Sequence, residues 1–157
     1  MKSQIILCSG GARSGKSEFA ERLALSTEGC KAYVATGQAF DEEMVDRIKK
    51  HQERRGAIWT NFEVPLYLAK EWQNISQSAD VILIDCLTMF TTNHMMAHGS
   101  IQGQQDANDL EEAVLSELES LLSLIASSDG KTVIFVTNEI GLGIVPDNKL
   151  ARYFRDI

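Results

Sequence analysis

The segment GGARSGKS at residues 10–17 stands between the short apolar run IILC at 5–8 and a helical pattern at 17–26. It satisfies the pattern G-x-x-x-x-G-K-[ST] of a phosphate-binding loop, in the strand–loop–helix setting that this pattern requires. Glycines let the backbone N–H groups turn toward phosphate oxygens, and the positive end of the following helix adds to the attraction. The predicted cradle consists of Gly10, Gly11, Ala12, Arg13, Ser14, Gly15, Lys16 and Ser17.

Two side chains of this loop carry the expected chemistry. Lys16 supplies a mobile positive charge for the β- and γ-phosphates of a nucleotide, which makes it a catalytic candidate, and the Ser17 hydroxyl is a ligand for Mg²⁺. The alternative is a glycine-rich turn that binds nothing.

Strand-like and helical patterns alternate on both sides of the loop. Strands are expected at 5–8, 31–36, 59–64, 81–86 and 132–137, and helices at 17–26, 41–55, 66–75, 107–126 and 147–157, with a loop at 99–108. This alternation predicts an α/β, P-loop NTPase-like fold with a mostly parallel sheet and helices on both faces. Because no boundary is visible, we expect residues 1–157 to form a single domain.

Composition narrows the classes of partner. Fifteen Lys and Arg against 22 Asp and Glu give a net charge of −7, which argues against broad binding to nucleic acid or to an anionic membrane. No apolar stretch approaches the roughly 20 residues of a membrane span. Three cysteines without C-x-x-C spacing are typical of reduced thiols, so we expect a cytoplasmic protein.

Asp85 ends the apolar run VILID at 81–85. A carboxylate at the end of a buried strand fits the second Mg²⁺ ligand of P-loop proteins, which binds the metal directly or through water. The alternative is an acidic residue at the solvent end of a strand.

His51 closes an apolar stripe that begins at Phe40. On spacing alone, a packed and hydrogen-bonded histidine is the more common outcome. Arg47, Arg54 and Arg55 lie one turn away and could surround a phosphate that a neutral imidazole attacks. They could equally be a solvated helix end.

Five segments together resemble the bifunctional adenosylcobinamide kinase / adenosylcobinamide-phosphate guanylyltransferase family of cobalamin biosynthesis. They are GGARSGKS (10–17), YVATGQ (33–38), DEEMVDRIKKHQERRGAIWTNFE (41–63), LIDCLT (83–88) and VTNEIGLGIVPDNKLARYFRDI (136–157). The resemblance covers nearly the whole chain and is far more specific than the P-loop alone.

The resemblance implies two reactions. ATP or GTP phosphorylates the aminopropanol hydroxyl of adenosylcobinamide, and GMP is then transferred from GTP to that phosphate, which gives adenosylcobinamide-GDP. In this family the second reaction passes through a guanylyl-histidine, and the matching residue is His51. The implied substrates are thus adenosylcobinamide and its phosphate with GTP and ATP, the cofactor is Mg²⁺, and the assembly is a homotrimer.

The resemblance also assigns nucleotide-binding positions outside the P-loop. They are Ala35, Thr36, Gly37, Gln52, Glu53, Arg54, Arg55, Glu63 and Asp85. For Glu63 we expect a carboxylate that accepts hydrogen bonds from the guanine N1–H and 2-amino group. A surface ion pair is its alternative.

Two further patterns follow buried strands. The loop at 141–146 is expected to contact the corrinoid or a partner subunit, with a helix-capping loop as the alternative. His94 and His98 have i, i+4 metal-ligand spacing but no third ligand, so packing or a substrate contact is favoured over a metal.

One departure concerns the end of the chain. Family members continue beyond FRDI at 154–157 with a further helix and a strand. Without that element we expect an exposed sheet edge, so trimerisation and activity need testing. Two other functions stay open: a simple small-molecule kinase without a covalent step, and a nucleotide-binding module that does no chemistry.

Overall fold

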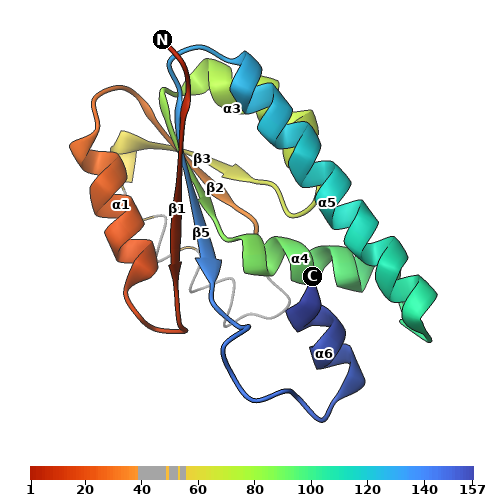
Figure 1. The fold of residues 1–157 in the computed structure, drawn as a ribbon. Helices are drawn as coiled ribbons and strands as arrows, with labels where there is room; N and C mark the ends of the chain where they lie inside the picture. The colour runs from red at the N-terminus through yellow and green to blue at the C-terminus, as the bar shows by residue number, and fades with distance from the viewer. Residues whose placement is uncertain (39–48, 50–52, 54–55) are drawn as a thin grey trace.

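The part of the chain that the computed structural model describes comprises residues 1–38, 49, 53 and 56–157. Within it, five strands form one sheet in the order β1-β5-β4-β2-β3, and every neighbouring pair is parallel (Figure 1). The strands are β1 (Gln4–Gly10), β2 (Lys31–Ala35), β3 (Trp59–Glu63), β4 (Val81–Asp85) and β5 (Thr132–Asn138). This topology confirms the predicted α/β, mostly parallel fold.

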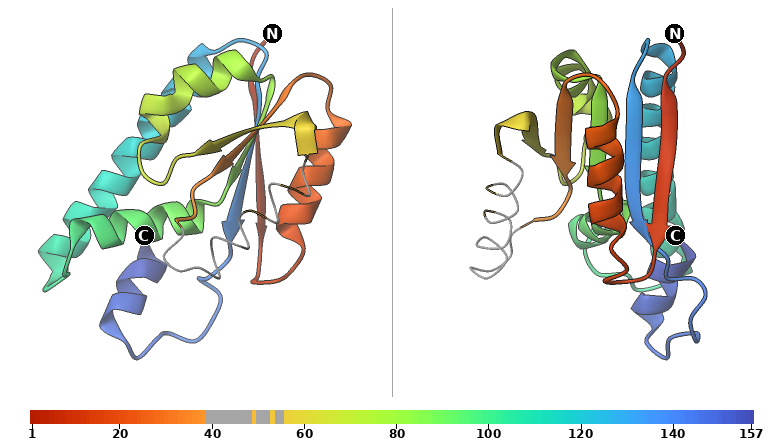
Figure 2. Two further views of the ribbon diagram at one scale, coloured as in Figure 1. Left: turned by 180° about the vertical axis from the view of Figure 1, so that it is seen from behind. Right: turned by 90° about the vertical axis from the view of Figure 1, so that its left-hand side faces the viewer.

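Helices cover both faces of the sheet, as predicted (Figure 2). They are α1 (Lys16–Ser26), α3 (Leu68–Ser78), α4 (Leu87–His98), α5 (Gln104–Ser127) and α6 (Lys149–Asp156). On one face α1 packs Ala20 and Ala24 against β1, β4 and β5. On the other face α3, α4 and α5 bury the larger core, which includes Leu68, Phe90 and Leu121. None of the described helices is both long enough and apolar enough to cross a bilayer.

The helix α4 is the element that the sequence analysis missed. Three threonines, an asparagine and two histidines interrupt the apolar residues of Leu87–His98, so the segment has no clear amphipathic period. The Cys86 side chain accepts a hydrogen bond from the Met89 N–H at the start of the helix. Tertiary packing of Phe90 in the core then compensates for the weak local pattern.

The predicted loop at 99–108 was wrong in its second half, because α5 begins at Gln104. The Asp106 carboxylate accepts from the backbone N–H groups of Gln102 and Gly103, which is one half of a capping box. The predicted helix at 41–55 lies outside the described residues, apart from Lys49 and Glu53.

The strand β1 is less buried than its apolar sequence predicts. It lies at one edge of the sheet, and Ile5 and Leu7 are 47% and 61% exposed on the face opposite α1. Phe19 of α1 is also exposed.

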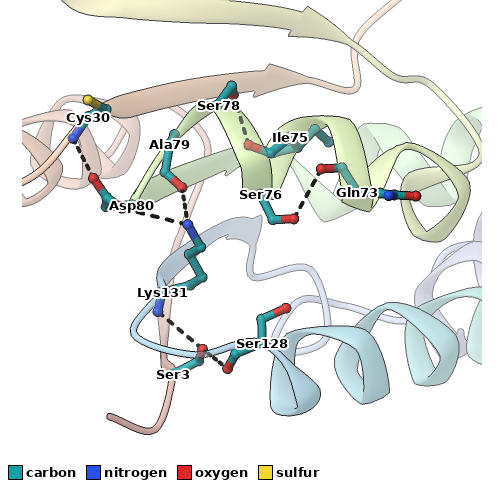
Figure 3. A network of polar contacts seen from close by, with 10 residues as sticks. All are labelled: Ser3, Cys30, Gln73, Ile75, Ser76, Ser78, Ala79, Asp80, Ser128 and Lys131. Carbon is teal, nitrogen blue, oxygen red and sulfur yellow. Dashed lines mark hydrogen bonds and ion pairs between the residues drawn. The ribbon is translucent and has the colours of Figure 1, made fainter.

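Polar side chains tie together the amino-terminal ends of the strands (Figure 3). Lys131 Nζ lies 3.6 Å from Asp80 Oδ1 and donates to the Ala79 carbonyl at 2.9 Å. The other oxygen of Asp80 accepts from the Cys30 N–H at 3.0 Å, and Ser3 Oγ accepts from the Lys131 N–H at 3.2 Å. These residues directly precede β1, β2, β4 and β5, so the network holds the starts of four strands in register.

Candidate functional site

The phosphate-binding loop joins β1 to α1 with a strained backbone. Arg13 and Gly15 have positive φ angles of 56° and 82°, a region that costs energy for arginine and little for glycine. A Cβ at Gly10 would lie 2.8 Å from Ser14 Oγ. The loop therefore has the curled shape that the motif predicts.

An open groove of about 580 Å³ runs between β1 and α1, with Leu7 and Phe19 in its lining, and it reaches the loop at Gly10, Ser14 and Lys16. Lys16 Nζ donates to the carbonyl of Gly11 at 3.0 Å. A carbonyl is a weaker partner for an ammonium than an anionic phosphate oxygen, so a nucleotide can take over Lys16 at low cost.

The end of β5 holds the base of the loop. The Glu139 N–H donates to the Gly10 carbonyl at 2.9 Å, and the Asn138 N–H donates to Thr88 Oγ1 at 2.8 Å. These bonds link the P-loop to the start of α4, on the opposite face of the sheet.

Three of the predicted site residues lie side by side at the carboxyl edge. Ala35 is in register with Asp85 of β4 and with Glu63 of β3. Residues aligned in neighbouring parallel strands point to the same face, and Ala35 packs with the cluster beneath α1. The carboxylates of Asp85 and Glu63 therefore share the face of the sheet that carries the P-loop helix.

Asp85 is held by an aromatic neighbour. The Tyr33 hydroxyl donates to Asp85 Oδ2 at 2.9 Å, and the Tyr33 ring packs edge-on against Trp59 with 6.0 Å between centroids. Both aromatic side chains are buried. The hydrogen bond fixes one carboxylate oxygen of Asp85 and its orientation.

The oxygen groups at this edge fit Mg²⁺. Ser17 lies in the first turn of α1, three residues before Ala20 and on the same side of the helix, and Asp85 projects from the sheet on that face. Mg²⁺ prefers one or two such protein oxygens and takes the rest of its shell from water and phosphate. Among the described residues no group of three or more His, Cys, Asp or Glu side chains gathers as a metal site.

Thr36 connects the end of β2 with the end of β4 through hydrogen bonds. Its buried side chain donates from Oγ1 to the Cys86 carbonyl at 2.6 Å and accepts from the Cys86 N–H at 2.8 Å. Its hydroxyl is therefore committed to the protein, and the half-buried Gly37 that follows is the more accessible part of this turn.

Sequence reasoning missed Asn93 in α4. Its buried amide donates to the carbonyls of Thr36 at 2.6 Å and Pro65 at 3.0 Å. An asparagine inside a helix gives no motif, whereas His94 and His98, which follow it, have i, i+4 metal-ligand spacing. The segment gives no distinct signal for Asn93, because three threonines and two histidines are interspersed with its apolar residues.

The two histidines of α4 have different surroundings. His94 Nε2 lies 3.1 Å from the carbonyl oxygen of Leu66, and the His94 ring packs against the Phe90 ring with 4.5 Å between the ring centroids. His98 is exposed at the end of the helix. The contacts of His94 support the packing role over a metal site.

The loop at 141–146 presents apolar side chains to solvent. Leu142 and Ile144 are 88% and 97% exposed, and Glu139 Oε1 accepts from the N–H groups of Gly141 and Leu142 at 2.7 and 3.0 Å. The cap of α6 is Asn148, which accepts from the Ala151 N–H at 3.1 Å. The predicted contact with a corrinoid or a partner subunit stays a prediction.

The predicted nucleophile His51 and its neighbours Gln52, Arg54 and Arg55 lie outside the described residues, and Glu53 is exposed. Their roles stay predictions.

Comparison with known proteins gives one family. The model of the cobinamide kinase / cobinamide phosphate guanyltransferase family matches residues 6–157. The chain belongs to this family. Membership confirms both the resemblance and the predicted class of enzyme, a transferase of cobalamin biosynthesis.

Relatives agree with this assignment. The bifunctional adenosylcobalamin biosynthesis protein CobU of Escherichia coli is 36% identical over 98% of this chain and 84% of its own length. CobU of Salmonella typhimurium is 40% identical with the same coverage, and CobP of Pseudomonas aeruginosa is 40% identical over 94% of this chain and 78% of its own length.

A solved structure shares the fold. It comes from a study of a prototypical ATPase of the type III secretion system of pathogenic bacteria, with a TM-score of 0.61 and 16% identity. The match covers 98% of this chain and 49% of the ATPase. This likeness confirms the P-loop NTPase-like fold.

Proposed function

We propose that this protein phosphorylates adenosylcobinamide with ATP or GTP and then transfers GMP from GTP to adenosylcobinamide phosphate through a guanylyl-histidine at His51. The observation that carries the proposal is the arrangement of the carboxyl edge, where Glu63, Ala35 and Asp85 stand in register on the face of the P-loop helix. A nucleotide bound there has its phosphates toward the P-loop and Asp85, and its base toward Glu63.

In the kinase step the P-loop amides and Lys16 bind the phosphates, while Ser17 and Asp85 would hold Mg²⁺. Bound Mg²⁺ neutralises phosphate charge. The aminopropanol oxygen attacks the γ-phosphorus, the bond to the β,γ-bridging oxygen breaks, and the hydroxyl proton leaves to water. The contribution of the chain is positioning and positive charge, which supply most of the acceleration in phosphoryl transfer.

In the second step a neutral His51 nitrogen attacks the α-phosphorus of GTP, and pyrophosphate leaves. A phosphate oxygen of adenosylcobinamide phosphate then attacks the same phosphorus, the P–N bond breaks, and His51 is regenerated. Gln52, Glu53, Arg54 and Arg55 follow directly in sequence, and the arginines can neutralise the negative charge that develops. Glu63 accepts from the paired N–H donors of guanine, which adenine lacks.

The direct test is incubation with α-labelled GTP. We expect protein-bound label that is lost in acid, survives alkali and is absent from His51→Ala. The exposed His98 offers a matched control, since His98→Ala removes an imidazole from α4 and should retain the label. An unlabelled wild-type protein that still phosphorylates adenosylcobinamide would indicate a simple kinase. Nucleotide binding without any corrinoid product would indicate a binding module.

The proposal extends to the state of the protein in the cell. We propose a cytoplasmic homotrimer whose residues 1–157 form one domain. Light scattering should give three times the mass of the chain, and thermal unfolding should follow one cooperative transition. A monomeric mass with full activity would contradict the trimer.

A further inference from the structure

We infer that Asn93 is a positioning residue for the base-binding side of the nucleotide site; this rests on the proposed function, in which Glu63 reads guanine. Asn93 lies on α4, on the face of the sheet opposite the P-loop helix. From there its Nδ2 group donates to the carbonyls of Thr36 and Pro65.

These two carbonyls mark the ends of the strands that carry the base-binding residues. Thr36 directly precedes Gly37, and Pro65 follows Glu63 by two residues. The backbone between the strands is bonded as far as Val64, whose N–H donates to the Ala35 carbonyl at 2.9 Å. Asn93 thus fixes the ends of β2 and β3 relative to each other just where Glu63 leaves the sheet.

Thr36 extends this connection to the metal side. Its N–H donates to the Asp85 carbonyl at 3.1 Å, and its hydroxyl exchanges two hydrogen bonds with Cys86. One buried amide therefore connects the strand end of Glu63 with that of Asp85. The spacing between the groups for guanine and for Mg²⁺ depends on this connection.

The Asn93 amide is not the side chain that would stabilise the fold most at this position. Among the residues that the structure describes, Asn93 Oδ1 is the one buried side-chain nitrogen or oxygen without a hydrogen-bond partner. A buried acceptor without a partner costs free energy. The gain that offsets this cost is a forked donor that bonds two backbone carbonyls at once, which an apolar side chain cannot do.

The contacts also set the design of the test. Both partners of Nδ2 are acceptors, so Asn93→Asp keeps the shape of the side chain but places a carboxylate against two carbonyl oxygens. Asn93→Ser keeps one donor in a smaller side chain and serves if the aspartate variant does not fold. Asn108→Asp, on the exposed surface of α5, repeats the chemical change away from the site.

The measurement is the dissociation constant of GTP and of inorganic tripolyphosphate, each with Mg²⁺, by calorimetry on proteins that all carry His51→Ala, so that GTP binds without being cleaved at its α-phosphorus. Tripolyphosphate reports the P-loop and the Mg²⁺ ligands without the base-binding side, because it has no base. We expect Asn93→Asp to weaken the binding of GTP by about tenfold, which corresponds to the loss of one hydrogen bond between guanine and the charged Glu63 carboxylate. The binding of tripolyphosphate should weaken by less than about twofold. Asn93→Ser should lie between wild type and Asn93→Asp, and Asn108→Asp should match wild type.

A double variant adds a readout that a purely structural role would not move. Because Asn93 acts through the position of Glu63, Glu63→Gln combined with Asn93→Asp should weaken GTP no more than the worse single change. Equal losses for GTP and tripolyphosphate, no loss for either, or fully additive losses would each overturn the inference. The α-labelled GTP experiment on wild type tests the guanylyl-histidine separately, so the two failures can be told apart.

Discussion

The two ends of one parallel sheet differ in how their polar groups are paired. At the amino-terminal ends, Lys131 and Asp80 bond each other and the neighbouring backbone. At the carboxyl ends, Lys16 bonds a carbonyl of its own loop, and Arg13 holds a strained backbone angle. The first end has its charges satisfied by the protein, and the second keeps a cation and curled amides for an anion. The pairing at the amino end stabilises the fold, and the proposed function puts nucleotide binding at the carboxyl end.

The largest effect should come from Lys16→Ala. Removing the charge nearest the transferred phosphate should lower kcat/KM for adenosylcobinamide phosphorylation by roughly 10²–10³-fold, the usual cost of deleting a group that stabilises developing charge. Because the hydrogen bond that Lys16 makes within the described part of the chain goes to a carbonyl of its own loop at 3.0 Å, Tm should stay near that of wild type. A large fall in Tm would contradict the division between the two ends.

A smaller effect is expected for Tyr33→Phe. The change removes the 2.9 Å hydrogen bond to Asp85 and keeps the ring against Trp59. Partners that orient a metal ligand typically contribute 10–100-fold in metal affinity, and the expected loss is at the low end of this range. It is measured as a rise in the Mg²⁺ concentration for half-maximal nucleotide binding. An unchanged Mg²⁺ requirement would show that Tyr33 does not orient Asp85 for the metal.

Asp80→Ala at the amino end should lower the stability of the protein and leave nucleotide binding unchanged. Half of the Asp80 side chain is exposed, so its ion pair with Lys131 contributes little, and the hydrogen bond to Cys30 N–H is the main loss. Unfolding should become easier by about 1 kcal/mol, a fall in Tm of a few degrees. The GTP dissociation constant should stay the same, and a change in it would break the comparison.

The smallest expected effect is a difference in alkylation rate between two thiols, Cys30 at the amino end of the sheet and Cys86 at its carboxyl end. Burial raises the pKa of Cys86 and outweighs the lowering by the hydrogen bond from the Met89 N–H, while the charge of Asp85 adds a smaller rise. Less thiolate is therefore present at neutral pH, and Cys86 should react with iodoacetamide more slowly than the exposed Cys30. Peptide mapping after timed labelling should find Cys30 first, with Cys86 catching up as the pH rises. Equal rates at neutral pH would contradict the buried setting of Cys86.

Local pattern was enough to predict the P-loop, the parallel sheet and the place of Asp85 at the end of β4. These features depend on glycine spacing and on short apolar runs, which a sequence displays directly. It was not enough to predict α4, whose threonines and histidines hide the helical period, or Asn93, whose role arises from carbonyls 57 and 28 residues away. Exposure of Ile5 and Leu7 likewise depends on β1 being an edge strand, which strand patterns alone do not reveal.

The central step of the proposed reaction is the bond between the phosphorus of GMP and a nitrogen of His51. Intact-protein mass spectrometry after brief exposure to GTP and Mg²⁺, followed by peptide mapping under alkaline conditions, tests it directly. We predict a mass increase of one GMP, located on His51 and discharged by adenosylcobinamide phosphate with release of adenosylcobinamide-GDP. A protein that forms adenosylcobinamide-GDP without ever carrying GMP, or that carries it on another residue, would contradict the account.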